Sequence, residues 1–346
     1  MNKIILLFLI VTGLFCNYLS AQTDNKLNKI DPADHDYKAN FFKNISKEAH
    51  DSIPSLGSML VWRKNGLVYE EYFGGANENT AFKVKSVTKT IVSALAGIAF
   101  DKGLLPDLKT PVVKLLPEYD KDLTKNKNIW FPDFIKNNDS LKRTLTLWDL
   151  ITMQSGFLWD DNNRMCTQAF HNSSDPARYM MDLPFETSPG TRFRYCTGGS
   201  HLVGVIVSKY VKTSLQNFAD STLFKPLGIT VTSWTSDGLG RNAGGTELSL
   251  KARDMMKFGL LYLNEGKVNG KQLISKSWIN ASTSEQAKLN EWDVLPGANG
   301  YGYYWWRRKT NGHQAFVASG YGGQLICVIP DLKMVIVTTC FVNDKN

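Results

Sequence analysis

Strand-like patterns occur near both ends of this 346-residue chain, and mostly helical patterns lie between them. Residues 58–63 and 67–73 are strand-like runs, and the Asn65-Gly66 pair between them is a strong signal for a hairpin. Later strand patterns cover residues 302–307, 315–319, 325–329 and 334–341. The sequence therefore predicts an α+β fold: one antiparallel β-sheet built from both chain ends and flanked by helices, with an all-helical subdomain inserted between them.

Helical patterns set the expected domain organisation. Apolar residues at helical spacing predict a helix over residues 37–51 and a buried helix over residues 86–102, which Gly103 ends. Further helices are expected over residues 146–153, 200–212 and 215–222. We expect one domain over residues 37–346, with its α/β part at 37–85 and 241–346 and its helical part at 86–240.

The first 21 residues have the pattern of a secretory signal peptide. Lys3 precedes a mostly apolar run over residues 4–15, and Ala21 offers a small residue for cleavage before Gln22. A helix of this length spans about 18 Å, whereas the hydrocarbon core of a bilayer is about 30 Å thick. We therefore expect an exported chain, periplasmic or secreted, without a stable membrane anchor. Residues 22–36 are expected to form a flexible leader.

Charge and composition exclude several classes of function. Hydrophobic residues make up 43% of the chain and aromatic residues 12%, which indicates a folded core rather than a disordered protein. The formal net charge is +8, but the basic residues lie in short, separated groups with acids or aromatics nearby. Because no continuous basic track results, we expect no nucleic-acid binding. The spacing of histidines and cysteines matches no zinc site, and no metal or other cofactor is expected.

Four cysteines remain after removal of the signal peptide. Export permits disulfides, and Cys166 with Cys196 is the more plausible bridge, although two free thiols remain the alternative. Cys327 and Cys340 lie on two predicted strands joined by residues 330–333. In that hairpin register they do not face each other, so both are expected to be free.

Ser86 and Lys89 are the strongest candidates for chemistry. They lie three residues apart at the start of the predicted buried helix, so the lysine amine can reach the serine hydroxyl. Burial lowers the pKa of a lysine from about 10.4, and a neutral amine can take a serine proton and create a nucleophile. The helix N-terminus also favours a developing anion there.

The residues around this pair resemble a known family. The matching segments cover residues 82–89 (Phe-Lys-Val-Lys-Ser-Val-Thr-Lys), 101–105, 116–118 and 145–156. They resemble the serine β-lactamase and penicillin-binding-protein superfamily, on the class C-type side that includes β-lactamase-related esterases, D-peptidases and 6-aminohexanoate-dimer hydrolases. The resemblance runs from about residue 58 to residue 339. It implies a β-lactamase/transpeptidase-like fold in which Ser86 is the nucleophile.

A second family element, Tyr-x-Asn or Tyr-x-Ser/Thr, resembles residues 189–199. The resemblance implies that Tyr195 approaches Ser86 and Lys89. Because a neighbouring cation can depress the pKa of a phenol, we expect Tyr195 and Lys89 to share one proton as a coupled pair. Which of the two groups is the base is left open.

The third family element, a Lys-Thr-Gly or His-x-Gly strand, corresponds to Ala318, Ser319 and Gly320. Ala318 replaces the family's cation, which argues against efficient β-lactam or D-Ala-D-Ala chemistry. Gly320 is expected to let the strand approach the substrate, and Ser319 to donate a hydrogen bond. The resemblance implies an oxyanion hole formed by the N–H groups of Ser86 and Tyr321.

Several further residues are candidates for substrate binding. Gln154 lies in the family's loop beside the site, and Trp159 follows that loop. Four aromatics lie close together in the first late strand, and alternation allows only one set to face the cleft: Tyr301, Tyr303, Trp305 and Trp306. Residues 242–245 resemble the family's glycine loop that closes the cleft, with an ordinary turn as the alternative.

Together these features predict an exported serine hydrolase that cleaves a small amide or ester through an acyl-enzyme. A D-alanyl-D-alanine-type peptidase or a β-lactamase is the first alternative. A non-catalytic penicillin-binding-like module is the second, although it would be expected to have lost Ser86, Lys89 or Tyr195. The family usually packs a last helix on its sheet, whereas this chain stops after a predicted strand. Either the sequence is truncated, or the helix over residues 37–51 alone covers that face and leaves an apolar patch that could bind another subunit in a homodimer.

Overall fold

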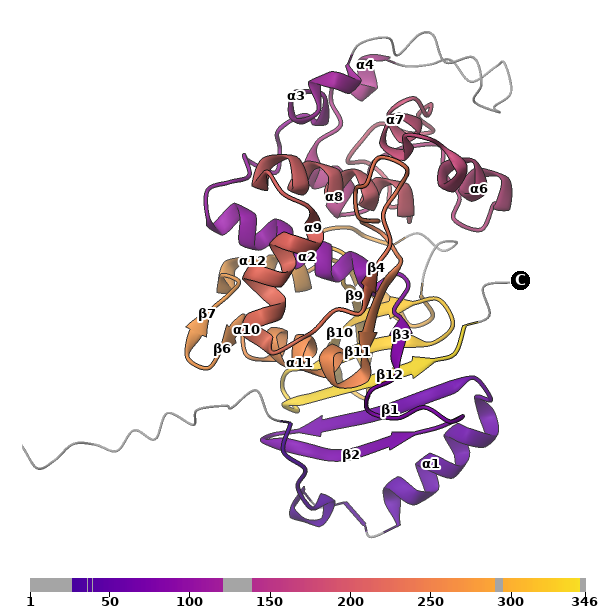
Figure 1. Cartoon of the computed structure of the whole chain (residues 1–346), viewed down its shortest axis with the longest axis vertical. Coiled ribbons are helices and arrows are strands. Elements are labelled where there is room, and N and C mark those ends of the chain that lie inside the picture. The colour runs from indigo at the N-terminus through magenta and orange to yellow at the C-terminus, as the bar shows by residue number, and fades with distance from the viewer. Residues whose placement is uncertain (1–26, 36, 39, 121–138, 290–294, 343–346) are drawn as a thin grey trace, which may run out of the picture.

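The structure is a computed structural model that describes residues 27–35, 37–38, 40–120, 139–289 and 295–342 (Figure 1). The predicted signal peptide and its cleavage site lie outside the described residues. The strands are β1 Leu56–Arg63, β2 Gly66–Tyr72, β3 Ala81–Lys83, β4 Ser233–Trp234, β5 Leu248–Lys251, β6 Lys267–Val268, β7 Lys271–Gln272, β8 Ala298–Tyr301, β9 Trp306–Thr310, β10 His313–Gly320, β11 Gln324–Ile329 and β12 Met334–Cys340.

Helices fill most of the sequence between β3 and β8. Those helices are α2 Val87–Asp101, α3 Val112–Leu115, η2 Pro117–Tyr119, α4 Asp139–Lys142, α5 Leu147–Ile151, α6 Arg164–Asn172, α7 Pro176–Met181, α8 Thr197–Val211, α9 Leu215–Ala219, η3 Asp220–Phe224, α10 Lys225–Leu227, α11 Ala252–Leu263 and α12 Lys276–Thr283. Two helices precede the sheet: η1 Pro32–His35 and α1 Phe41–Ser52. In the ranges that the structure describes, no helix is long and apolar enough to cross a membrane.

One antiparallel sheet joins the two ends of the chain. Among the described residues its strand order is β2-β1-β12-β11-β10-β9-β8, and β1 pairs with β12 so that Val61 lies opposite Ile336. The small sheet β3-β5-β4 lies beside the start of α2 (Figure 1). These observations confirm the predicted fold: an antiparallel sheet from both chain ends, flanked by helices.

Helices pack against both faces of the sheet near its β2 edge. On one face α1 packs against β2, where the ring of Phe42 stacks on that of Tyr69 at 4.8 Å between centroids. On the other face α11 contacts β1, β11 and β12. Gly259 permits this approach, because a Cβ there would lie 2.6 Å from Val335 and 2.8 Å from Ile326. The chain before α1 adds to the same edge, since the N–H of Ile30 donates to Leu67 O at 3.2 Å.

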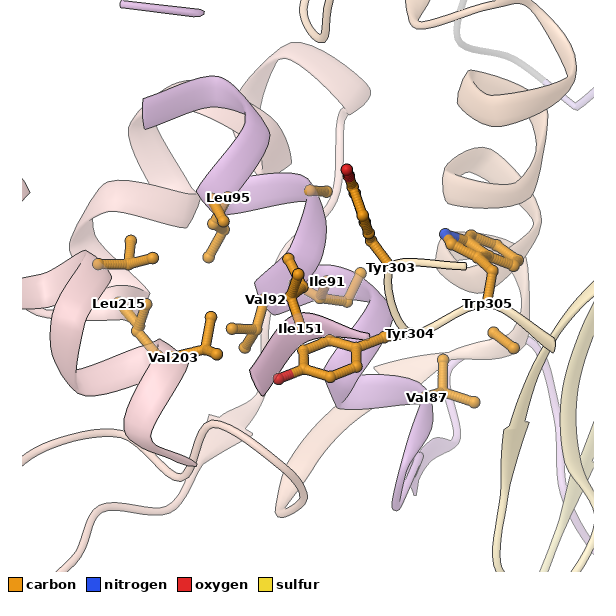
Figure 2. Packing of buried hydrophobic residues seen from close by; sticks show 14 of the residues in the cluster. Val87, Ile91, Val92, Leu95, Ile151, Val203, Leu215, Tyr303, Tyr304 and Trp305 are labelled. Atoms are coloured by element: carbon orange, nitrogen blue, oxygen red, sulfur yellow. The ribbon is translucent and has the colours of Figure 1, made fainter. Parts of the chain in front are cut away.

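The helix α2 forms the centre of the core. Val87, Ile91, Val92 and Leu95 are fully buried, and Figure 2 shows them among side chains from α5, α8 and α9. Such all-round burial fixes the helix axis, since any rotation would open cavities in a close-packed interior. The first turn of α2 is therefore held rigidly at the edge of the core.

The first late strand differs from the prediction. Residues 302–305, predicted as part of a strand over 302–307, form the turn between β8 and β9. In this turn Gly302 N–H donates to Trp305 O at 2.8 Å, and Tyr304 has a φ of 67°. The turn is stabilised by its aromatic side chains, which enter the helical core (Figure 2). Tyr304 OH donates to Leu150 O at 3.3 Å.

An ion pair connects α11 with β2. Arg253 donates to both carboxylate oxygens of Glu70 at 2.6 and 2.7 Å, while the Glu70 side chain is only 2% exposed. Burial alone would raise the pKa of Glu70, but Arg253, Lys29 and Tyr72 lower it to about 2. The stability that this carboxylate contributes is therefore present above pH 4.5 and is lost as the pH falls towards 2.

We predict that Glu70→Gln reduces the acid sensitivity of the fold. Between pH 7 and about pH 3 the wild type should lose about 1–2 kcal/mol more unfolding free energy than the variant, because the variant has no carboxylate to protonate at this position. Urea unfolding at both pH values measures the difference, and the other carboxylates cancel because both proteins contain them. An equal loss in the two proteins would show that Glu70 does not carry this dependence.

Candidate active site

Ser86 lies immediately before α2, and Lys89 lies in the first turn of that helix. Lys89 Nζ donates to Ser86 Oγ at 2.8 Å and to the carbonyl oxygen of Gly245 at 2.9 Å. Lys85, just before Ser86, has a φ of 49°, a left-handed conformation that turns the chain sharply into the helix. The structure thus places the predicted pair within hydrogen-bond distance, and it assigns the predicted glycine loop a direct contact with the lysine.

Burial lowers the pKa of the Lys89 amine below that of an ordinary lysine. The side chain is 1% exposed, and desolvation lowers its pKa to about 8, while the nearby Asp161 and Cys196 raise it to a lesser degree. A substantial fraction of the amine is therefore neutral at slightly alkaline pH. A neutral amine 2.8 Å from Ser86 Oγ is placed to accept the hydroxyl proton.

Tyr195 lies beside this pair, two residues before α8. Its ring centroid is 4.9 Å from Lys89 Nζ, and the indole of Trp306 stacks on its other side at 5.6 Å. Burial raises the pKa of the Tyr195 phenol well above its ordinary value, and the hydroxyl of Ser86 lowers it only in part. The direction is opposite to the expected depression of this pKa by a cation, because desolvation is the largest effect on the phenol and the nearby Asp161 and Cys196 add to it.

A cleft of about 500 Å³ opens over the serine. This volume falls within the usual range for small-molecule sites. The cleft is lined by five of the predicted residues, Ser86, Tyr195, Ser319, Gly320 and Tyr321. It is also lined by Trp306, one of the four candidate aromatics, and by residues that the sequence did not indicate: Asp160, Asp161, Asn162, Arg194, Thr197 and Leu295.

Gly320 brings β10 against the segment that carries Ser86. A Cβ at this position would lie 2.4 Å from Val84 O and 3.2 Å from the Cβ of Lys85, so any side chain would push the strand away. Among the described residues, neither the N–H of Ser86 nor that of Tyr321 donates to a backbone acceptor. Both N–H groups therefore remain available for an oxygen of a bound molecule.

Asp161 lines the cleft and holds neighbouring groups in place. Its Oδ2 accepts hydrogen bonds from Thr197 N–H at 3.0 Å and from the indole N–H of Trp159 at 2.8 Å. It thereby fixes the start of α8 next to Tyr195 and contributes negative charge near Lys89. The sequence offered one signal for this residue, its position directly after Trp159 and Asp160, but no motif distinguished it.

The structure does not bring Trp159 or Gln154 to the cleft. Trp159 is 2% exposed and packs edge-on against Phe170. Gln154 is 8% exposed, and its side-chain amide donates to Thr152 Oγ1 at 3.0 Å. Both side chains support the walls of the site rather than lining it. Of the late aromatics, Trp306 faces the cleft, whereas Tyr301, Tyr303 and Trp305 are buried in the core.

The four described cysteines are free thiols. Cys166 and Cys196 therefore do not form the disulfide that the sequence left open. Cys196 instead caps α8, where its Sγ accepts the N–H of Gly199 at 3.2 Å. Cys327 lies opposite Ile336, out of register with Cys340, as expected for that hairpin. Within the described ranges, no group of three or more His, Cys, Asp or Glu side chains is placed to hold a metal ion.

Arg194 lines the cleft and is paired with a neighbouring carboxylate. Arg194 donates to both carboxylate oxygens of Glu186 at 3.2 and 2.9 Å, so its positive charge is balanced by a neighbour. Ala318, at the position of the family's cation, is fully buried in β10. The cleft therefore presents hydroxyl, amide and aromatic groups together with Asp160 and Asp161.

Comparison with known proteins agrees with this geometry. A family model for Beta-lactamase matches residues 43–345. The chain belongs to the Beta-lactamase family. Protein flp of Staphylococcus aureus (strain N315) is 25% identical over 204 residues, which cover 57% of this chain but only 38% of that protein. The 6-aminohexanoate-dimer hydrolase of Paenarthrobacter ureafaciens is 23% identical over 299 residues, 81% of this chain and 71% of that one.

Solved structures share the fold of this Beta-lactamase-family chain. A D-stereospecific amidohydrolase from Streptomyces sp. superposes with a TM-score of 0.64 at 18% identity, over 86% of this chain and 93% of the other. The penicillin-binding protein homologue from Pyrococcus abyssi gives a TM-score of 0.62 at 20% identity, over 86% and 71% of the two chains. At this level of identity the likeness shows the fold alone.

We predict that Asp161→Asn shifts the titration of Lys89. Asparagine keeps an oxygen for Thr197 and Trp159 but removes the negative charge that favours the ammonium, so the pKa of Lys89 should fall. The rate of Ser86 labelling by a fluorophosphonate should then reach half its maximum at a pH lower by about half a unit or more. Asp160→Asn is the matched control, because Asp160 lines the cleft without contributing to the pKa shift of Lys89. An unchanged profile for Asp161→Asn would contradict this role.

Proposed function

We propose that this protein is an exported serine hydrolase that cleaves an amide or ester bond through an acyl-enzyme on Ser86. The observation that carries the proposal is the buried amine of Lys89, 2.8 Å from Ser86 Oγ at the mouth of a cleft. Burial of an ammonium in the first turn of a helix costs free energy, and such a cost is typical of a group with a functional role. Membership of the Beta-lactamase family supports this reading.

Acylation begins with proton transfer from Ser86 Oγ to the neutral amine of Lys89. The serine oxygen attacks the substrate carbonyl carbon, and the resulting oxyanion accepts hydrogen bonds from the N–H groups of Ser86 and Tyr321. The proton then passes to the leaving amine or alcohol, and the bond to that group breaks. Tyr195 keeps its proton at neutral pH because its pKa is raised, so its phenol serves as a hydrogen-bond donor to the leaving group or as a relay from Lys89.

Deacylation repeats these steps with water in place of the leaving group. Lys89 takes a proton from the water, which attacks the acyl carbonyl, and the tetrahedral oxyanion again lies between the two N–H groups. Collapse of this intermediate releases the acid and returns a proton to Ser86. The relative pKa values of Lys89 and Tyr195 favour the lysine as base in both half-reactions.

The cleft favours a substrate that needs no carboxylate-binding cation. Ala318 supplies no charge, and Arg194 is held by Glu186. These features favour a small amide or ester, the class indicated by the name of the 6-aminohexanoate-dimer hydrolase, over a β-lactam or a D-alanyl-D-alanine peptide. Export rests on the signal-peptide pattern of the first 21 residues.

Labelling with a fluorophosphonate and hydrolysis of a p-nitrophenyl ester test the nucleophile. Wild type should be labelled and active, whereas Ser86→Ala should lose both, because among the described residues Ser86 carries the hydroxyl that is hydrogen-bonded to the lysine amine. Ser93→Ala is the matched control: Ser93 is a fully buried serine on the same helix, away from the cleft, and should be labelled like wild type. Absence of label on wild type, or equal label on Ser86→Ala, would refute the proposal.

The substrate class requires a second comparison. Turnover of a 6-aminohexanoate dimer, a D-Ala-D-Ala peptide and nitrocefin should be measured on the same preparation. We expect the amide dimer or simple esters to be hydrolysed faster than the other two. Fast nitrocefin turnover would show that the absence of a cation at Ala318 does not exclude β-lactams.

A further inference from the structure

A histidine outside the cleft contacts the loop that holds the lysine. His201 lies in α8 and is 3% exposed. Its Nδ1 accepts the N–H of Gly244 at 3.3 Å, and its Nε2 lies 3.1 Å from Asp237 Oδ2. Because Nδ1 is an acceptor, the proton of the neutral ring is on Nε2, where it is donated to Asp237. The ring thus has one defined tautomer and two fixed partners.

Asp237 is itself held firmly. Its Oδ1 accepts the N–H groups of Leu239 and Arg241 at 2.9 and 3.0 Å, and its Oδ2 accepts Arg241 Nε at 2.7 Å. Burial would raise the pKa of Asp237, but His201 and Arg241 lower it well below its usual range. The carboxylate is therefore ionised and is a stable acceptor for the imidazole.

Arg241 extends this network to the helical part of the chain. Its Nη2 donates to Asp175 Oδ1 at 2.7 Å, and its Nη1 donates to Tyr119 OH at 2.8 Å. Asp175 also caps α7 by accepting the N–H of Arg178 at 3.1 Å. His201 is thus connected through Asp237 and Arg241 to two separate helices, which limits its movement.

The loop that His201 contacts lies tightly against α8. A Cβ on Gly244 would lie 2.6 Å from Ser200 O, and one on Gly245 would lie 2.4 Å from Ser200 Oγ. At the preceding residue, the indole N–H of Trp234 donates to Ala243 O at 2.9 Å. His201 and Trp234 thus bind the N–H and the carbonyl of the same peptide, Ala243–Gly244, which lies two peptide units before the Gly245 carbonyl.

We propose that His201 is a positioning residue for the catalytic lysine: it fixes the Gly244–Gly245 loop so that the Gly245 carbonyl orients the amine of Lys89 toward Ser86. With one N–H of the neutral amine bound to Gly245 O, the amine is held so that its lone pair can point toward Ser86 Oγ. This inference rests on the proposed function, since it assigns His201 a part in the same proton transfer. His201 itself touches neither the substrate cleft nor the reacting atoms.

Charged and titratable groups surround both Lys89 and His201. Lys89 faces Tyr195, Asp161 and Cys196 as well as the Gly245 carbonyl. His201 faces Asp237, the ring of Phe170 and the nearby His171. Because a carbonyl oxygen stabilises an ammonium, loss of the Gly245 contact should lower the pKa of Lys89, in addition to slowing proton transfer.

The experiment compares three variants with wild type. His201→Leu removes both contacts of the ring. His201→Asn retains an acceptor near the position of Nδ1 and so can still bind Gly244 N–H. His171→Gln is the matched control, because His171 lines the same neighbouring cavity but does not contact the loop through a hydrogen bond in the described structure. For each, the rate of p-nitrophenyl ester hydrolysis and of fluorophosphonate labelling is measured from about pH 5 to pH 10.

We expect His201→Leu to reduce kcat by about 10- to 100-fold with little change in KM, since small misplacements of a catalytic group cost rate rather than binding. The acidic limb of its pH profile should move to lower pH by about half a unit or more. His201→Asn should recover most of the rate, and His171→Gln should match wild type. A loss that is equal at every pH and is not recovered by asparagine would overturn the positioning role and leave a purely structural one.

A crystal structure of His201→Leu separates this inference from the proposed function. Displacement of the Gly245 carbonyl beyond hydrogen-bond distance from Lys89 Nζ is the expected result. Retention of the wild-type 2.9 Å contact would overturn the inference whatever the activity. If wild type is not labelled at Ser86, the proposed function fails by that measurement alone.

Discussion

The desolvated amine of Lys89 is the interaction on which the rest of the site depends. The amine donates two hydrogen bonds, to Ser86 Oγ and to Gly245 O. Because the Lys89 side chain is 1% exposed, the amine cannot exchange these bonds for bonds to water. Burial lowers its pKa and thereby supplies a base, while the same burial raises the pKa of Tyr195 and leaves a proton donor next to it. One environment thus shifts the pKa values of two neighbouring groups in opposite directions.

The fold brings three distant segments to this amine. The start of α2 supplies Ser86 and Lys89, β10 from the end of the chain supplies Gly320, and the loop before β5 supplies Gly245. Two of these approaches require glycine, because a Cβ at Gly320 or Gly245 would collide with neighbouring atoms. The sheet built from both chain ends therefore determines the distance between Ser86 and β10, the strand that lines the cleft.

Much of this arrangement could be predicted from local patterns. The spacing of Ser86 and Lys89 on a helix, the hairpin at Asn65-Gly66 and the late strands follow from periods and turn signals that act over a few residues. The turn over residues 302–305 could not be predicted, because its aromatic residues look like strand residues and are stabilised by burial in the helical core. The burial of Trp159 could not be predicted for a similar reason, since it depends on contacts with Phe170 and Asp161.

Other parts of the site depend on tertiary contacts that have no sequence signal. The Gly245 carbonyl is a backbone group, so no residue type indicates that it accepts from Lys89. The direction of the Tyr195 pKa shift depends chiefly on desolvation, which follows from the burial of the ring among residues that are distant in the sequence, such as Trp306 and Lys89. Sequence therefore indicated the groups that are proposed to react, and the structure was needed to find the contacts that shift their pKa values.

Direct titration of Lys89 tests the central claim. NMR of the protein with ¹³C-labelled lysine, compared with Lys89→Arg to assign the signal, follows the ε-carbon as the pH rises. The account predicts a midpoint near 8 for the signal that is missing in Lys89→Arg. A midpoint at the ordinary value of 10.5 would contradict it, because Lys89 would then remain an ammonium at the pH where the enzyme is proposed to work.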